Sequence, residues 1–345
     1  MTCPGQTCWR SWNAATRRGR GRASTDCGGL TPHGEQDTED STRSGQPSVT
    51  RRAFLRLGCA AILGTVATGG TGAAYAFRVE PAWVEVTHVS LPLTGWPVSP
   101  TLRIAQLSDL HVGKYVEAAR IRSAVEITNR LQPDLVLLTG DFVYGLSVEC
   151  GPDCTRELAA LRARHGVYAV IGNHDVWTDV ADMIARDLRK SGIEVLRNER
   201  RRLEIEGGRL WLLGIEDTGY TGFPGTPFTE FVAAWRGRAS ALQDLLEGIP
   251  EAEPRLLLAH NPDFAEMLPP GRIDLVLCGH THGGQVRLPF LGAPILPSCF
   301  GQRYGGGLVQ RDALRVYVNR GIGLTPPPIR FNCRPEVTMF SLRGV

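Results

Sequence analysis

The chain lacks a strong excess of charge of either sign. Its 345 residues carry 38 Lys and Arg against 35 Asp and Glu, a formal net charge of +3. Residues 1–76 hold nine Arg, no Lys and five acidic residues, which is +4, so residues 77–345 carry 3 − 4 = −1. This balance offers no basic footprint of the kind that nucleic acids require, and we expect no nucleic-acid binding.

The chain also has no evident internal repeat, so its fold does not come from stacked copies of one unit. Residues 1–48 lack helical or strand periodicity and are rich in Gly, Ser, Thr, Arg and acidic residues, which predicts disorder. The rest of this 42% hydrophobic sequence is long enough to bury a sizeable core. We expect residues 77–345 to form the folded body.

Paired arginines precede an apolar run between residues 49 and 76. Residues 50–58 read TRRAFLRLG and lead into CAAILGTVATGGTGAAYA, which ends in the triplet Ala74-Tyr75-Ala76. This resembles a twin-arginine export signal with cleavage after Ala76, and it predicts export across the cytoplasmic membrane to the envelope or beyond. An uncleaved anchor is the alternative, although the Gly and Thr content makes the run a poor permanent span. Such signals begin near the chain start, so we expect translation to begin close to Val49.

Cysteine is unevenly distributed along the chain. Four of the nine cysteines lie in the leader, and the other five are Cys150, Cys154, Cys278, Cys299 and Cys333. Five is an odd number, so at least one thiol stays unpaired. In an exported protein the CGPDC stretch at 150–154 can close a small disulfide loop, with metal binding or two reduced thiols as the alternatives.

Apolar runs alternate with helical patterns from about residue 100 onward. Seven such runs predict strands buried on both faces: 102–111, 134–141, 166–175, 209–217, 255–263, 274–284 and 314–323. Helices are predicted over 117–131 and 228–248. Thr155 and Thr178 are predicted N-caps of two more helices, the second ending at Gly192. The alternation predicts an α/β fold of stacked layers.

Polar clusters follow five of these runs. In α/β sheets the carboxyl ends of the strands share one rim, so we expect the clusters to converge on one site. Their members are Asp109, His111, Asp141, Asn173, His174, Asp175, His260, His280 and His282. Carboxylates, imidazoles and amide oxygens bind divalent transition metals. One ion in a hydrolase takes three or four protein ligands, so this larger set predicts two ions that share a bridging carboxylate.

The blocks SDLH, TGD, GNHD, AHNP and GHTHGGQ, in this order, resemble the signature of the calcineurin-like metallophosphoesterases over roughly residues 100–345. The resemblance implies a four-layer sandwich in which two mixed β-sheets pack face to face and are flanked by helices. GHTHGGQ and the closing PIRFNCRPEVTMFSL are similar to a bacterial branch of exported or membrane-surface phosphodiesterases. That branch includes enzymes that cleave the pyrophosphate of UDP-2,3-diacylglucosamine. CGPDC and the long leader are not part of the pattern.

Carried over by motif, the resemblance implies one ion on Asp109, His111 and His282, the second on Asn173, His260 and His280, and Asp141 between them. It implies hydrolysis of a phosphodiester or pyrophosphate by a hydroxide that bridges the ions. His174 is then free for acid catalysis, and Asp175 is expected to orient its ring. A phosphomonoesterase of the same fold and a non-catalytic binding scaffold are the alternatives.

The ligand types suit manganese, iron or zinc. Twin-arginine substrates cross the membrane folded, which allows metal loading in the cytoplasm, so we expect manganese or iron.

An apolar, proline-rich loop, residues 286–307, follows the last motif. It either packs on the body or meets a membrane or an acyl chain through Phe290, Leu291, Ile295 and Leu296. Arg303 and Arg330 are candidates to pair with phosphate. A lipid-linked substrate and contact with a membrane surface are therefore among the expected partners, beside the export machinery.

Overall fold

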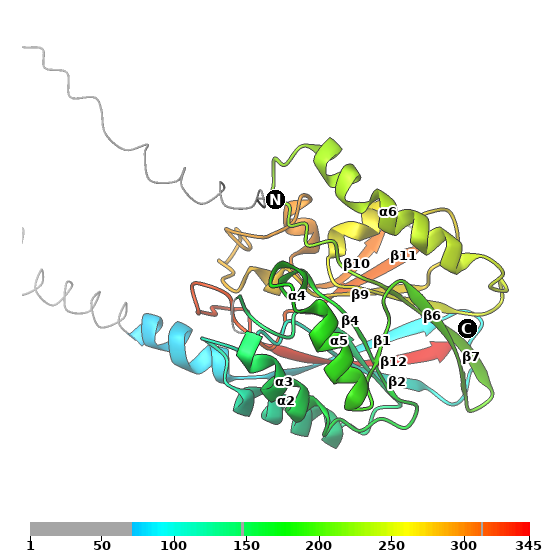
Figure 1. The fold of residues 1–345 in the computed structure, drawn as a ribbon, viewed down its shortest axis with the longest axis horizontal. Helices are drawn as coiled ribbons and strands as arrows, with labels where there is room; N and C mark the ends of the chain where they lie inside the picture. Colours follow the sequence, from blue (N-terminus) through cyan, green and yellow to red (C-terminus); the bar gives the residue numbers. More distant parts are fainter. Residues whose placement is uncertain (1–70, 146–147, 312) are drawn as a thin grey trace, which may run out of the picture. The chain divides into compact units, whose positions relative to one another are not determined.

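The computed structural model describes residues 71–145, 148–311 and 313–345 (Figure 1). The leader, residues 1–48, and most of the predicted export signal, residues 49–76, lie outside the described residues. Within the described part of the chain, no helix combines the length and the apolarity that crossing a bilayer requires.

The described strands form two mixed sheets of six. The first sheet has the order β1 (Glu85–Leu93), β12 (Glu336–Gly344), β2 (Leu102–Leu107), β3 (Leu135–Thr139), β4 (Val167–Val170) and β5 (Glu194–Val195). The second has the order β10 (Gly307–Arg311), β11 (Leu314–Val318), β9 (Leu275–Cys278), β8 (Arg255–Ala259), β7 (Gly208–Ile215) and β6 (Glu199–Ile205). Parallel pairs dominate the middle of both sheets: β2 to β5 in the first, β7, β8, β9 and β11 in the second.

Helices cover the outer faces of the sheets, so the molecule has four layers, as predicted (Figure 1). Those against the first sheet are α2 (Ala118–Arg130), α3 (Gly151–Leu158) and α5 (Ala181–Lys190), and α6 (Phe228–Leu246) lies against the second. A core between the sheets holds Ile104, Leu137 and Val170 from one side and Leu212, Leu258 and Leu277 from the other. Strands buried on both faces explain why the apolar runs were continuous.

All seven predicted strands form, and so do the helices predicted over 117–131 and 228–248. The two predicted N-caps are wrong. Thr155 lies inside α3, where its hydroxyl donates to the carbonyl of Gly151, and Thr178 follows the short helix α4 (Asn173–Trp177). α5 does end just before Gly192, whose φ is +79°. An isolated threonine is a weak signal because its hydroxyl also bonds carbonyls within a helix.

Cys150 and Cys154 do not form a disulfide in the structure, and both are free thiols, as are Cys278, Cys299 and Cys333. Cys154 is buried in α3 against the core of the first sheet. The pair therefore contributes packing at this position.

Candidate active site

The polar clusters that follow five strands meet where the two sheets adjoin. β2, β3 and β4 of the first sheet lead into Asp109, Asp141 and Asn173, and β8 and β9 of the second lead into His260 and His280. Because these strands are parallel within each sheet, their carboxyl ends lie at the same edge. All the predicted site residues are buried except His174, which is half-buried.

Five of the site residues have a left-handed backbone. φ is positive at Asp109 (50°), His111 (48°), Asp141 (59°), His280 (71°) and His282 (52°). This conformation costs a non-glycine residue roughly 1–3 kcal/mol and persists only where surrounding contacts hold it. One such contact is the backbone N–H of His280, which donates to both carboxylate oxygens of Asp109, at 2.9 and 3.1 Å.

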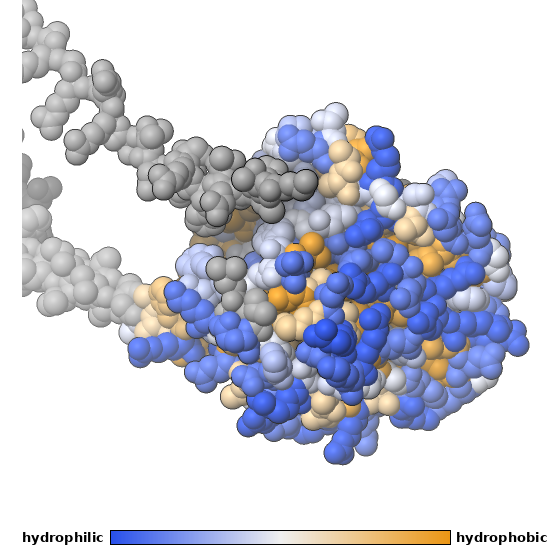
Figure 2. Space-filling view, viewed as in Figure 1, coloured by the Kyte–Doolittle hydropathy of each residue, from blue (hydrophilic) through white to orange (hydrophobic). Residues whose placement is uncertain are grey.

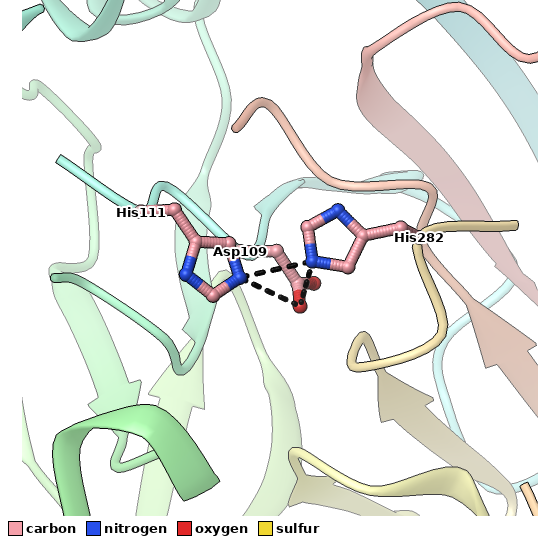
Figure 3. A group of neighbouring side chains, drawn as sticks. All are labelled: Asp109, His111 and His282. Atoms are coloured by element: carbon pink, nitrogen blue, oxygen red, sulfur yellow. Dashed lines mark hydrogen bonds and ion pairs between the residues drawn. The ribbon is translucent and has the colours of Figure 1, made fainter. Parts of the chain in front are cut away.

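Asp109, His111 and His282 form a compact group (Figure 3). Nε2 of His111 lies 2.9 Å from Nε2 of His282, which lies 3.3 Å from Oδ1 of Asp109. The ligand atoms of the three residues all lie within 4.8 Å of one another. Two imidazole nitrogens and a carboxylate oxygen facing one point are an arrangement in which a divalent cation binds.

Asn173, His260 and His280 form a neighbouring group around one amide oxygen. Oδ1 of Asn173 lies 2.9 Å from Nε2 of His260 and 2.7 Å from Nδ1 of His280. Asp141 lies between the groups, because its Oδ2 is 3.4 Å from Nε2 of His111 and 3.2 Å from Nε2 of His260. The structure thus brings together all seven residues that the sequence nominated as ligands.

The electrostatics of this site suit bound cations. Asp109 and Asp141 are 0% and 1% exposed, and within the described residues their ion-pair partners are all histidines. Burial raises the pKa of Asp109 to about 7 and lowers the pKa of His111 to about 3. Buried carboxylates without a permanently charged partner are costly. Divalent ions would compensate the negative charge of both carboxylates, Asp109 and Asp141, so the residues present fit such ions.

His260 is held in the orientation that a metal ligand needs. Its Nδ1 donates to the carbonyl oxygen of Thr139 at 2.6 Å, which leaves Nε2 facing Asn173 and Asp141. A backbone acceptor on the second ring nitrogen fixes the tautomer and the ring plane of a ligating imidazole.

Two glycines let the backbone pass close to the carboxylates. A Cβ at Gly172 would lie 2.2 Å from Oδ1 of Asp141. At Gly279 it would lie 1.9 Å from Oγ of Ser108 and 2.2 Å from Oδ2 of Asp109. Any side chain at these positions would displace the carboxylates, so the glycines of GNHD and GHTHGGQ serve close approach.

His174 lies beside the two groups with an aromatic ring on either flank. Its ring centroid is 5.4 Å from that of Tyr144 and 4.6 Å from that of Trp177. Burial lowers its pKa, and its backbone N–H donates to Oδ1 of Asp141 at 2.8 Å. The imidazole is thereby placed next to any group bound between the two clusters.

Asp175 lies away from its expected partner, the His174 ring. Its carboxylate accepts hydrogen bonds from the backbone N–H groups of Asp141 (3.0 Å), Phe142 (3.0 Å), Val143 (3.3 Å) and Gly172 (3.1 Å). Among the residues described, no hydrogen bond joins it to that ring. The turn after β3 has buried N–H groups that need an acceptor, and Asp175 supplies it. Its contacts therefore hold Asp141 in place.

A cavity of about 470 Å³ opens beside this site. Asn173, His174, His280 and His282 form its inner wall. Its outer wall is mainly apolar and includes Trp177, Phe223, Val286, Ile295, Pro326 and Ile329. Of the described residues that line it, none is Lys, Arg, Asp or Glu. The cavity therefore joins a site for cations to a space suited to an uncharged group.

The structure corrects two of the expectations about residues near the cavity. Leu296 is 3% exposed, so its predicted contact with lipid is wrong. Arg330 is fully buried, and its guanidinium donates to four backbone carbonyls, which leaves it no part in binding phosphate. Arg303 forms an ion pair with Glu266 at 2.8 Å. Arg330 is therefore engaged within the body, whereas the side chain of Arg303 is 47% exposed beside Glu266, and its role as a phosphate partner stays a prediction.

Sequence reasoning missed three side chains near the site: Tyr144, Trp177 and Asp217. Asp217 follows β7, is 2% exposed, and burial raises its pKa to about 7. It ends the apolar run WLLGIED, which is the same signal that identified Asp109 and Asp141. Trp177 lies on the same short helix as His174 and could have been found from that spacing.

Comparisons with known proteins point to one family. The model of the calcineurin-like phosphoesterase family matches residues 102–284. Phosphodiesterase YaeI of Escherichia coli (strain K12) is 33% identical over 302 residues, which cover 85% of this chain and 99% of that protein. The uncharacterized metallophosphoesterase YkuE of Bacillus subtilis (strain 168) is 31% identical over 305 residues, covering 86% and 98%. Among solved structures, the Haemophilus influenzae NAD nucleotidase NadN matches with a TM-score of 0.42 at 17% identity, over 67% of this chain and 48% of that one.

Proposed function

This chain belongs to the calcineurin-like phosphoesterase family, which makes it a phosphoester hydrolase, and we propose that it is an exported phosphodiesterase with two divalent metal ions. The observation that carries the proposal is the convergence of seven ligand-type side chains in two groups joined by Asp141. Asp109, His111 and His282 would hold one ion, and Asn173, His260 and His280 the other.

The residues around those ions have different roles. When bound, a pair of divalent cations supplies a water of lowered pKa and compensates charge on the phosphoryl oxygens. The carboxylate of Asp141 lies between the two groups and would contact both ions. The carboxylate of Asp175 accepts the backbone N–H of Asp141 and so holds Asp141 in position. His174 is the group placed to protonate the leaving oxygen, because its half-buried ring adjoins the site and lines the cavity.

The cavity favours a phosphodiester over a phosphate monoester. A monoester carries a second negative charge, which proteins commonly bind with Arg or Lys. The lining offers neither, whereas a diester carries one charge and a second organic group that the apolar wall can accept. The phosphodiesterase name of the Escherichia coli relative agrees with this reading.

We also propose that manganese or iron is the resident metal and that it is loaded before export. Export would use the twin-arginine route and would bring the protein to the envelope, outside the cytoplasmic membrane. The support is the paired-arginine stretch at 50–58 and the absence of thiolates from the ligand set. Metal analysis of protein purified from its native compartment, without chelator, tests the metal assignment. Zinc alone would contradict it.

Hydrolysis of two model esters tests the function. The full chain, purified without chelator, is assayed on bis-p-nitrophenyl phosphate and p-nitrophenyl phosphate with Mn²⁺, Zn²⁺, Mg²⁺ or no metal. We expect metal-dependent cleavage with preference for the diester. Preference for the monoester would instead identify a phosphomonoesterase, and inactivity with every metal would leave a binding scaffold.

A further inference from the structure

The loop at the mouth of the cavity exposes several large apolar side chains. Leu288 and Gly292 pair in a tight hairpin, with backbone bonds of 2.8 and 3.0 Å. Phe290 at its tip is 111% exposed, and Leu291 and Ile295 are 66% and 70% exposed. Single exposed apolar residues are ordinary, but a contiguous group around a cavity marks a binding surface. Ile295 itself also lines the cavity.

The first described residues reach the same end of the molecule. The N–H of Arg330 donates to the carbonyl of Ala76 at 2.9 Å, and the neighbouring Phe331 bonds with Gln285 and Arg287, directly before the hairpin. Figure 1 shows the start of the described chain, the loop before β12 and the loop after β9 at one end of the fold. Hydrophobic residues are visible there in Figure 2 as well.

The segment after Ala76 adds its own apolar side chains to this end. Phe77 and Val79 are 54% and 49% exposed, and the exposed Arg78 lies between them. An arginine flanked by exposed apolar residues suits a surface that is apolar inside and anionic at its boundary. Together with the hairpin they form what we name the apolar rim: Phe77, Val79, Leu288, Phe290, Leu291 and Ile295.

The same segment is a built part of the body. Glu80 is 1% exposed, and its carboxylate accepts the backbone N–H groups of Asn332 (2.9 Å) and Cys333. Arg120 donates to the carbonyl of Pro81 at 2.8 Å. The apolar run at 59–70 is therefore joined covalently to a fixed point beside the hairpin.

The peptide bond after Ala76 is poorly presented for cleavage. Residues 71–79 are helical, and Ala76 is buried with its carbonyl bonded to Arg330. A protease binds an exposed, extended segment, so this helix would have to unfold from the body first. This favours the retained anchor among the two readings of the export signal.

We propose that the apolar rim docks on a lipid bilayer, with the retained segment upstream of residue 71 as its tether and Phe290 inserted among the acyl chains. The proposal rests on the proposed export of the protein and deepens it. A tether fixed beside the hairpin brings the rim to the membrane to which it leads, and Arg78 then meets anionic headgroups. The mouth of the cavity would face the bilayer, so that a substrate with an apolar group enters from it.

Fluorescence quenching by brominated lipids tests this docking. The full chain carrying Phe290→Trp is mixed with vesicles of phosphatidylcholine and phosphatidylglycerol whose acyl chains are brominated. Its matched control is Val98→Trp, since Val98 is 78% exposed and lies near Gly344, at the opposite end of β12. The unsubstituted protein provides the background of the native tryptophans. We expect both variants to float with the vesicles. The brominated lipids should quench most of the fluorescence of the tryptophan introduced at residue 290 and little of that of the tryptophan introduced at residue 98.

Equal quenching at both positions, or no flotation, would overturn the proposal. So would self-association of the full chain that Phe290→Ser abolishes, because the rim would then bind a second copy. Hydrolysis of bis-p-nitrophenyl phosphate in solution is measured on each variant, and Phe290 does not line the cavity. Normal hydrolysis without quenching refutes the docking alone, whereas absent hydrolysis in the unsubstituted protein refutes the proposed catalysis.

Discussion

Replacing Asp175 by Asn should destabilise the protein and disturb the metal site together. The two carboxylate oxygens of Asp175 accept four backbone N–H bonds, two to each oxygen. Asparagine keeps one oxygen, so two buried donors lose their acceptor and face an NH₂ group. At about 1.5–3 kcal/mol for each bond to a charged group, the loss is roughly 3–6 kcal/mol.

The lower end of that range is the better expectation. Burial raises the pKa of Asp175 to about 7, so the neutral amide avoids part of the cost of a buried charge. About 3 kcal/mol corresponds to a fall in Tm of roughly 6–12 °C for a domain of this size. Because the turn that bears Asp141 loses its support, activity and metal content should each fall by roughly 10- to 100-fold.

The assays are thermal unfolding, metal content and hydrolysis of bis-p-nitrophenyl phosphate by the full chain. Asp179→Asn is the matched control, because Asp179 is exposed and has φ +55°, which asparagine tolerates. Loss of activity with unchanged Tm and full metal content would refute the reasoning. It would mean that Asp175 acts on the His174 ring after all.

Three further predictions concern the same centre. Asp141→Asn should abolish hydrolysis while the circular dichroism spectrum stays unchanged, and retained activity would refute its place between two ions. His174→Ala should lower kcat on the diester by about 10²- to 10⁴-fold at unchanged metal content, with the exposed His88→Ala as control; similar rates for both would remove His174 from proton transfer. A chelator should abolish hydrolysis and lower Tm, because the buried carboxylates lose their counter-ions, and Mn²⁺ should restore both; a Tm that ignores the chelator would contradict the proposed metal content.

Much of the fold was readable because its signals are local. A continuous apolar run followed by a polar turn identifies a strand buried on both faces, and every such run became one. β5, an edge strand of two residues, carries too little periodicity to be recognised. Four longer strands, β1, β6, β10 and β12, were also not among the predicted runs. The N-caps at Thr155 and Thr178 failed because a single hydroxyl has competing local partners.

The residue types of the site were readable from the sequence as well, since the order of strands in an α/β fold already brings their carboxyl ends to one edge. The order of the strands determined which seven side chains lie close together, but it did not determine the orientation or the hydrogen-bond partners of each side chain. The structure shows that Asp175 serves the turn bearing Asp141, and that Leu296 and Arg330 are buried where exposure was expected.

The sequence by itself determined the layers of the fold, the family motifs and the ligand-type residues, because periodicity and strand-end position are local properties. Only the tertiary structure decided the left-handed backbones of Asp109 and His280, the partners of Asp175 and the joining of Ala76 to the hairpin side. These features depend on contacts between segments far apart in the chain, and a contact of that kind leaves no pattern within either segment.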